Sequence, residues 1–126
     1  MKKESEPQTN AKPLLTGDPA SPGVVVGKAK IVLSPKDAEK FEKGDILVIN
    51  LPYATPYQVP LEVLILLLKK AGGVITDEWG ITSNVAMFCR GTGIPCVVRT
   101  EKATKVLKDG NTVIVDGTKG LIYLKE

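Results

Sequence analysis

Residues 71–98, AGGVITDEWGITSNVAMFCRGTGIPCVV, decide the fold that we predict for this chain. The apolar run 74–76 predicts a buried strand, and residues 84–90 predict a helix that stops at Gly91. The run 94–98 predicts the next strand. A strand, a helix and a strand joined by short loops favour parallel pairing of the two strands through a right-handed crossover. The stretch therefore predicts an α/β fold.

The residues before this stretch extend the same pattern. Residues 17–19 and 21–23 predict turns because they are rich in Gly and Pro, and the β-branched residues that follow predict a strand over 24–32. Residues 34–43 predict a short helix, and the continuous apolar run 45–49 predicts a strand that is buried on both faces. A helix thus separates these two strands, as parallel pairing requires.

The residues after position 60 complete the expected architecture. Residues 61–70 predict a helix that two glycines terminate, and residues 102–108 predict a shorter helix. The chain closes with two predicted strands, 112–116 and 121–125, which a glycine-containing turn joins. We therefore expect a mainly parallel sheet with crossover helices and a C-terminal β-hairpin.

The composition is that of one globular domain. The chain has 126 residues, of which 43% are apolar, and this is enough to bury a single core without disulfides or metals. The first 13 residues are polar and show no periodicity. We predict a flexible tail or linker remnant over 1–13 and a folded domain over 14–126. Many Lys, Glu, Val and Ile with few Asn and Gln are typical of a thermophilic protein.

Charge, hydropathy and cysteine content exclude several classes of function. The net charge is only +3, and 17 basic residues are interleaved with 14 acidic ones, so we expect no nucleic-acid binding. The most apolar run, 63–68, is far shorter than the about 20 residues of a membrane span. Cys89 and Cys96, in a chain without histidine, form neither a disulfide framework nor a zinc site. We expect a cytoplasmic domain without metal or cofactor.

Five phrases of the sequence, at residues 20–23, 44–48, 71–78, 93–98 and 109–117, occur in an order that is found in a known family. Together they resemble the mobile domain of phosphoenolpyruvate-utilising enzymes, which is the swivelling phosphohistidine domain of phosphoenolpyruvate synthase, pyruvate phosphate dikinase and enzyme I. The resemblance implies a swivelling β/β/α architecture over residues 14–126. It also implies a histidine that accepts a phosphoryl group at one site and carries it to another.

The phrase that should contain this histidine lacks it. The family has Gly-x-Thr-Ser-His-Ala-Ala where this chain has GITSNVA over residues 80–86, so Asn84 stands at the position of the histidine. Thr82 falls on a hydroxyl position that resembles a regulatory phosphorylation site of some dikinases. An amide nitrogen is delocalised and essentially non-basic, and the chain has no histidine elsewhere. The resemblance therefore implies that this chain cannot perform the family's phosphoryl transfer.

Other departures from the family pattern gather near Asn84. The family has glycine where Trp79 and Arg99 stand, whereas Arg90 matches a family arginine. Loops at the carboxyl ends of parallel strands meet in one crevice, and Tyr, Trp and Arg are enriched at binding hot spots. The predicted binding face comprises Tyr53, Tyr57, Trp79, Asn84, Val85, Phe88, Arg90 and Arg99. We interpret the chain as a non-catalytic scaffold whose former active face is altered, by design, for protein binding or self-association.

Several residues allow a second interpretation. Between Leu61 and Leu68 the predicted helix is apolar on most sides, which is typical either of a buried helix or of an oligomer contact. Asn84 is also a candidate N-cap of its helix. Cys89 and Cys96 are each expected to be buried, although Cys89 near a helix start could act as a nucleophile.

Two other functions remain open at this point. One is a phosphotransfer domain inactivated by the change at Asn84. The other is an active site rebuilt in the same crevice around Cys89, Glu78 or a tyrosine. Arg90 and Arg99 could in addition hold an anion together with the free amides at the start of the helix.

Overall fold

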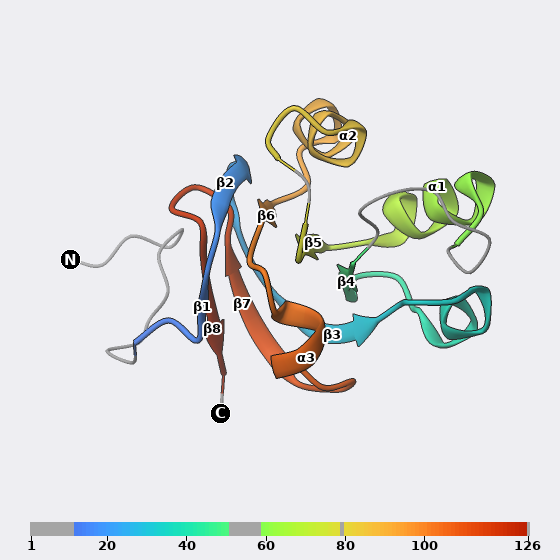
Figure 1. Cartoon of the computed structure of the whole chain (residues 1–126), viewed down its shortest axis with the longest axis horizontal. Helices are drawn as coiled ribbons and strands as arrows, with labels where there is room; N and C mark the ends of the chain where they lie inside the picture. Colours follow the sequence, from blue (N-terminus) through green and yellow to red (C-terminus); the bar gives the residue numbers. More distant parts are fainter. Residues whose placement is uncertain (1–11, 51–58, 79, 126) are drawn as a thin grey trace.

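A computed structural model of the chain describes residues 12–50, 59–78 and 80–125 (Figure 1). Its centre consists of four parallel strands, and the order of neighbours is β3, β4, β5 and β6. Their bounds are Val24–Ile31, Ile46–Ile49, Gly73–Thr76 and Cys96–Val98. The crossover segments are the 3-10 helix η1 (Pro35–Lys40) and the α-helices α1 (Leu61–Lys70) and α2 (Asn84–Thr92). The α/β fold class predicted from residues 71–98 is confirmed.

Antiparallel strands flank this parallel centre on both sides. The predicted hairpin is formed by β7 (Thr112–Asp116) and β8 (Leu121–Leu124), and β7 pairs with β3. The short strand β1 (Leu15–Thr16) pairs with β8, and β2 (Asp18–Ser21) pairs with β6. Every antiparallel pair thus involves at least one strand outside the group β3–β6.

The strand β2 corrects the turns predicted before residue 24. Residues Asp18–Ser21 are extended and pair with β6, although they contain Pro19. Proline lacks an amide donor and is tolerated where a strand has no neighbour on one side, and β2 is the last strand in the sheet order. The register also shifts between Pro19 and Ser21, which marks a bulge.

Only Gly17 separates β1 from β2, so one continuous segment forms both ends of the strand order. A Cβ atom on Gly17 would lie 2.4 Å from the carbonyl oxygen of Val98, so this crossing requires a residue without a side chain. The strands consequently form two layers. One buried cluster lies between them and includes Leu15, Ile75 and Ile122.

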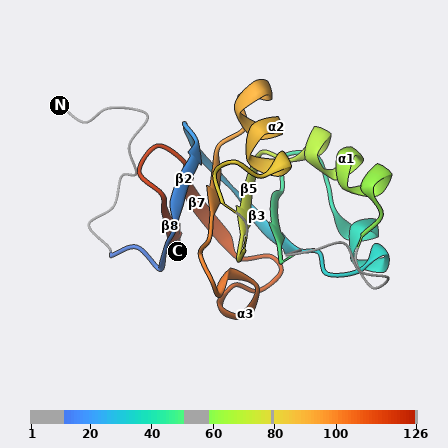
Figure 2. The same cartoon turned by 45° about the horizontal axis from the view of Figure 1, so that its top comes forward.

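A second buried cluster lies between the parallel strands and the helices. It includes Leu47 from β4, Leu67 from α1 and Ala86 from α2. Figure 2 shows α1 and α2 on one side of the parallel strands, with α3 (Ala103–Val106) on the opposite side. Two strand layers and one helical layer make the swivelling β/β/α architecture that the family resemblance implied.

The helix ends differ from the sequence predictions at two places. Gly93, rather than Gly91, ends α2, because Gly93 takes the left-handed conformation with φ 76° and its N–H donates to the Cys89 carbonyl. The last helix covers only Ala103–Val106, since Leu107 is already extended. In the part of the chain that the structure describes, no helix is long and apolar enough to cross a membrane.

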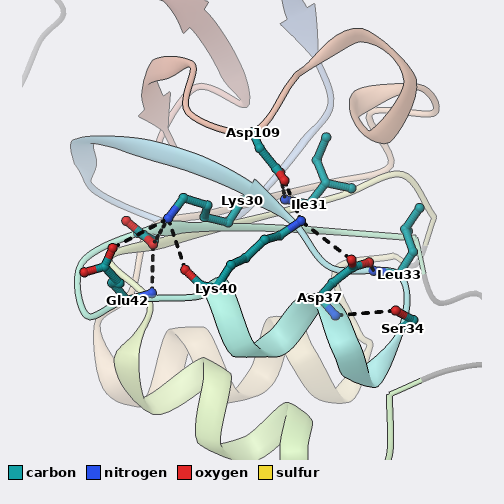
Figure 3. Close-up of polar contacts among 9 residues, drawn as sticks. Lys30, Ile31, Leu33, Ser34, Asp37, Lys40, Glu42 and Asp109 are labelled. Atoms are coloured by element: carbon teal, nitrogen blue, oxygen red, sulfur yellow. Dashed lines mark hydrogen bonds and ion pairs between the residues drawn. The ribbon is translucent and has the colours of Figure 1, made fainter.

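Lys30 near the end of β3 donates a hydrogen bond to the carbonyl of Lys40 in η1 and forms an ion pair with Asp45 just before β4 (Figure 3). Lys30 Nζ lies 2.8 Å from a carboxylate oxygen of Asp45, which also accepts a hydrogen bond from the Glu42 N–H at 2.8 Å. Both charged side chains are largely covered, with 14% of Lys30 and 11% of Asp45 exposed. The pKa of Lys30 is raised by its hydrogen bond to Asp45.

Asp109 joins the turn before β7 to the same corner. Its carboxylate accepts a hydrogen bond from the Ile31 N–H at 2.7 Å and lies 2.5 Å from Lys40 Nζ. Lys40 Nζ also lies 3.7 Å from Asp37, whose carboxylate accepts a hydrogen bond from the Leu33 N–H. We call the following set the corner network: Lys30, Asp37, Lys40, Asp45 and Asp109.

Candidate binding face at the carboxyl edge of the parallel strands

The carboxyl ends of β4, β5 and β6 lie at one edge, and the loops after β5 and β6 meet there, as the sequence predicted. Backbone hydrogen bonds join them directly: Asp77 N–H donates to the Ile49 carbonyl at 3.1 Å, and Thr100 N–H donates to the Thr76 carbonyl at 3.0 Å. The predicted face residues Tyr53, Tyr57 and Trp79 lie outside the described residues.

Asp77 holds the loop after β5 against α3. Its carboxylate accepts hydrogen bonds from the Thr104 N–H at 3.0 Å and from the Thr104 hydroxyl, and only 3% of the residue is exposed. The Glu101 N–H donates to the Asp77 carbonyl at 2.9 Å. Sequence reasoning did not assign a role to Asp77. The sequence signal that could have identified Asp77 is its position as a carboxylate directly after a buried strand.

Arg99 lies on the surface directly after β6. Its Nε is 3.6 Å from a carboxylate oxygen of Asp18, and both side chains are more than half exposed. Arg99 has φ 57° and Glu101 has φ 71°, a left-handed conformation that favours glycine. This backbone conformation explains why the family has glycine at position 99. Arginine adopts the same conformation at a cost in folding free energy.

Asn84 is the first residue of α2 and is exposed. The N-cap is Ser83, whose Oγ accepts a hydrogen bond from the Ala86 N–H at 3.2 Å. The prediction that Asn84 caps the helix was therefore wrong. Ser83 is extended, with ψ 159°, and places its hydroxyl under the first turn, whereas the backbone of Asn84 is already helical.

Two predicted face residues of α2 point toward the core. Val85 is 4% exposed and belongs to the buried cluster between the parallel strands and the helices. Phe88 is partly buried and packs against the same cluster. Val85 and Cys89 are four residues apart and share the buried side of the helix. The prediction that Val85 lies on the binding face was wrong, because this helical spacing turns it inward.

Arg90 links α2 to β2. Its Nη1 donates a hydrogen bond to the Ala20 carbonyl at 2.8 Å. Arg90, Ile81, Thr118 and Ser21 line a cavity of about 480 Å³. The Ser21 hydroxyl is buried and has no hydrogen-bond partner among the described residues. Arg90 and Arg99 line different cavities, so the structure does not bring them together as one anion site.

The two cysteine thiols are buried and free. The pKa of the Cys96 thiol is raised by its hydrogen bond to Cys89 and by burial. Cys89 is 0% exposed, which confirms the prediction of a buried cysteine and does not fit a nucleophile in an open crevice. Among the described residues, no group of three or more His, Cys, Asp or Glu side chains is placed to hold a metal.

The helix α1 is buried on one side and exposed on the other, so each interpretation of its apolar sequence applies to one side. Leu64, Leu67 and Leu68 are buried, whereas Leu61 is 69% exposed and Leu66 is 58% exposed. The α1 outer face, as we use the term, consists of Leu61, Glu62, Ile65, Leu66 and Lys69, all of which are exposed. An apolar helix face open to solvent is a feature of interaction surfaces.

Comparisons with known proteins agree with this architecture. A family model described as the mobile domain of PEP-utilising enzymes matches residues 41–120. A probable phosphoenolpyruvate synthase of Archaeoglobus fulgidus is 45% identical over 126 residues, covering 97% of this chain and 16% of the relative. The phosphoenolpyruvate synthase of Pyrococcus furiosus is 42% identical over 120 residues, covering 95% of this chain and 14% of the relative.

A solved structure shows the same similarity in three dimensions. An enzyme I protein, determined by NMR in solution, has a TM-score of 0.53 and 27% sequence identity over 70% of this chain and 33% of its own. The present chain spans at most 16% of the length of the two curated relatives. Those relatives come from thermophilic archaea, in keeping with the amino-acid composition.

Proposed function

This chain belongs to the family of PEP-utilising enzyme mobile domains, and from that premise we propose that it is a swivelling-domain scaffold that binds protein without carrying phosphate. The supporting observation is the side chain at the start of α2, where Asn84 is exposed in the first turn. A phosphoryl acceptor at this position must present a basic nitrogen lone pair, and an amide nitrogen has none.

The exposed surface of the helices α1 and α2 favours a protein partner. Asn84 and Met87 are exposed on α2, and the α1 outer face lies in the same helical layer. Exposed leucine and methionine interspersed with charged side chains resemble the mixed composition of protein interfaces. Such a surface is compatible with a natural or a designed origin of the substitutions.

One observation favours a second candidate, a phosphotransfer domain inactivated at Asn84 alone. The helix α2 is held at both ends, by the Ser83 cap at its start and by the hydrogen bond from Arg90 in its last turn to β2, as a phosphohistidine helix would need. In this candidate, the surface would still dock on the donor site of a phosphoenolpyruvate synthase.

A labelling experiment separates these functions. The unmodified protein and the Asn84→His and Asn84→Gln variants are incubated with radiolabelled phosphoenolpyruvate or ATP, with and without intact Pyrococcus furiosus phosphoenolpyruvate synthase. The proposal predicts no covalent label on any of the three proteins. Label on Asn84→His alone would favour the second candidate, and label on the unmodified protein would overturn both.

A further inference from the structure

The α1 outer face has no partner within the described part of the chain. Figure 2 shows α1 at the outside of the helical layer, and only its inner side contacts the core through Leu64, Leu67 and Leu68. On the outer side, Leu61, Ile65 and Leu66 expose 69%, 36% and 58% of their surfaces. Such exposure carries a hydration cost that a covering surface would remove.

The charges on α1 lie near opposite ends of the same face. Glu62 is in the first turn, and Lys69 and Lys70 are in the last turn. Glu62 and Lys69 are seven residues apart, or about 10 Å along the axis, which is too far for a pair within one helix. No salt bridge joins either residue to another part of the described chain.

The spacing of these residues matches itself when the helix is reversed. Glu62 lies three positions before Ile65, and Lys69 lies three positions after Leu66. A two-fold axis that faces Ile65 with Leu66 of a second copy therefore also faces Glu62 with Lys69 of that copy. A parallel arrangement would instead place Glu62 next to Glu62 and Lys69 next to Lys69, which is repulsive.

We propose that α1 pairs in an antiparallel manner with α1 of a second copy of this chain, forming a symmetric dimer through the α1 outer face. The inference rests on the proposed function and names its partner. The interface is isologous, since each copy contributes the same apolar stripe and the same two charges. Two Glu62–Lys69 pairs would flank a central contact of Ile65 and Leu66.

The expected dimer is weak. A ten-residue helix is about 15 Å long, and a stable complex buries about 800 Å² on each partner. One face of α1 provides less area than this, so we expect a reversible dimer with a dissociation constant on the order of 100 µM.

Sedimentation equilibrium over a wide concentration range tests the dimer. The unmodified chain should shift from monomer to dimer as concentration rises through about 100 µM. Leu66→Glu should weaken the association by about tenfold or more, because it places two carboxylates at the centre of the contact. Leu124→Glu is the matched control, since Leu124 is exposed on β8 in the other strand layer and should leave the equilibrium unchanged.

A charge exchange tests the antiparallel orientation. Glu62→Lys gives a face with only positive charges, and Lys69→Glu gives a face with only negative charges. Each variant alone should dimerise less than the unmodified chain, whereas an equimolar mixture of the two should form heterodimers. The double variant, which exchanges both charges, should recover the original affinity. Circular dichroism confirms that each variant is folded.

Two results would overturn the inference: a chain that stays monomeric up to millimolar concentration, or a dimer that neither Leu66→Glu nor the charge variants affect. The proposed function fails by a different observation. Covalent label on the unmodified protein would refute the proposed function whatever the oligomeric state. A monomeric protein without label would refute only the proposed dimer.

Discussion

The corner network and the loops at the carboxyl edge are held in place in different ways. At the corner, the carboxylates of Asp45 and Asp109 each accept hydrogen bonds from a lysine and from a backbone N–H. At the carboxyl edge, backbone hydrogen bonds and the buried Asp77 join the loops, and the side chains of Asn84 and Arg99 remain exposed. The difference suggests that charged side chains determine stability at the corner, while the edge can change its side chains without losing its shape.

The largest expected effect is at the corner. Asp45→Ala leaves the covered ammonium of Lys30 without its nearest partner and the Glu42 N–H without an acceptor. We expect the free energy of unfolding to fall by about 2 kcal/mol, measured by urea denaturation. Asp18→Ala breaks the exposed pair with Arg99 and should cost less than about 0.5 kcal/mol. Equal losses in the two variants would contradict the comparison.

The next effect concerns the start of α2. Ser83→Ala removes the hydroxyl that accepts from the Ala86 N–H, and the free energy of unfolding should fall by about 1 kcal/mol. Asn84→Ala should change it much less, because Asn84 does not cap the helix. Thermal unfolding of both variants measures the difference. A greater loss for Asn84→Ala would restore Asn84 as the structurally important residue.

A smaller effect of opposite sign is expected at Arg99. Arg99→Gly relieves the left-handed backbone at φ 57° and loses only an exposed ion pair, so the protein should gain up to about 1 kcal/mol of stability. Arg99→Ala is the control, since it loses the same ion pair and keeps the unfavourable conformation. Denaturation midpoints should place glycine above arginine and alanine below it; the reverse order would show that the conformation is not strained.

The smallest expected effect is a change in the stability of the protein at acid pH, caused by Asp109 in the corner network. Burial raises the pKa of Asp109, but the hydrogen bond from the Ile31 N–H and the nearby Lys40 ammonium outweigh burial, and the pKa is lowered overall. A lowered pKa contributes stability above the ordinary Asp pKa of about 4, and this contribution is lost as pH falls through the folded-state value.

Asp109→Asn keeps the acceptor for the Ile31 N–H and removes the charge. The decrease in stability between neutral and acid pH should therefore be smaller in this variant than in the unmodified protein. Urea denaturation at a series of pH values measures both slopes. Identical slopes would show that Asp109 is not held by the network.

Much of the fold could be predicted because local patterns and tertiary structure agree. The alternation of apolar runs and helices from residue 24 onward gave β3 to β6 with small errors at helix ends. The strand β2 could not be predicted, because Pro19 disfavours a strand in isolation and is accepted only where no neighbouring strand needs its amide.

The candidate site was less predictable than the fold. Sequence reasoning placed the loops of β5 and β6 together, but it could not distinguish Ser83 from Asn84 as the cap, since both side chains can perform that role. It also placed Val85 on the surface, because it selected residues that depart from the family pattern, and that criterion does not show which side of α2 packs against the core. Sequence reasoning did not decide whether the helix α1 is buried or forms an interface, since the number of apolar residues does not show which of them pack against the sheet.

The central claim is that the exposed amide of Asn84 cannot carry phosphate. The most direct measurement is the intact mass of the unmodified protein after incubation with phosphoenolpyruvate, ATP and intact Pyrococcus furiosus phosphoenolpyruvate synthase, recorded at neutral to alkaline pH so that a phosphoramidate would survive. We predict an unchanged mass. A species heavier by one phosphoryl group would contradict the account.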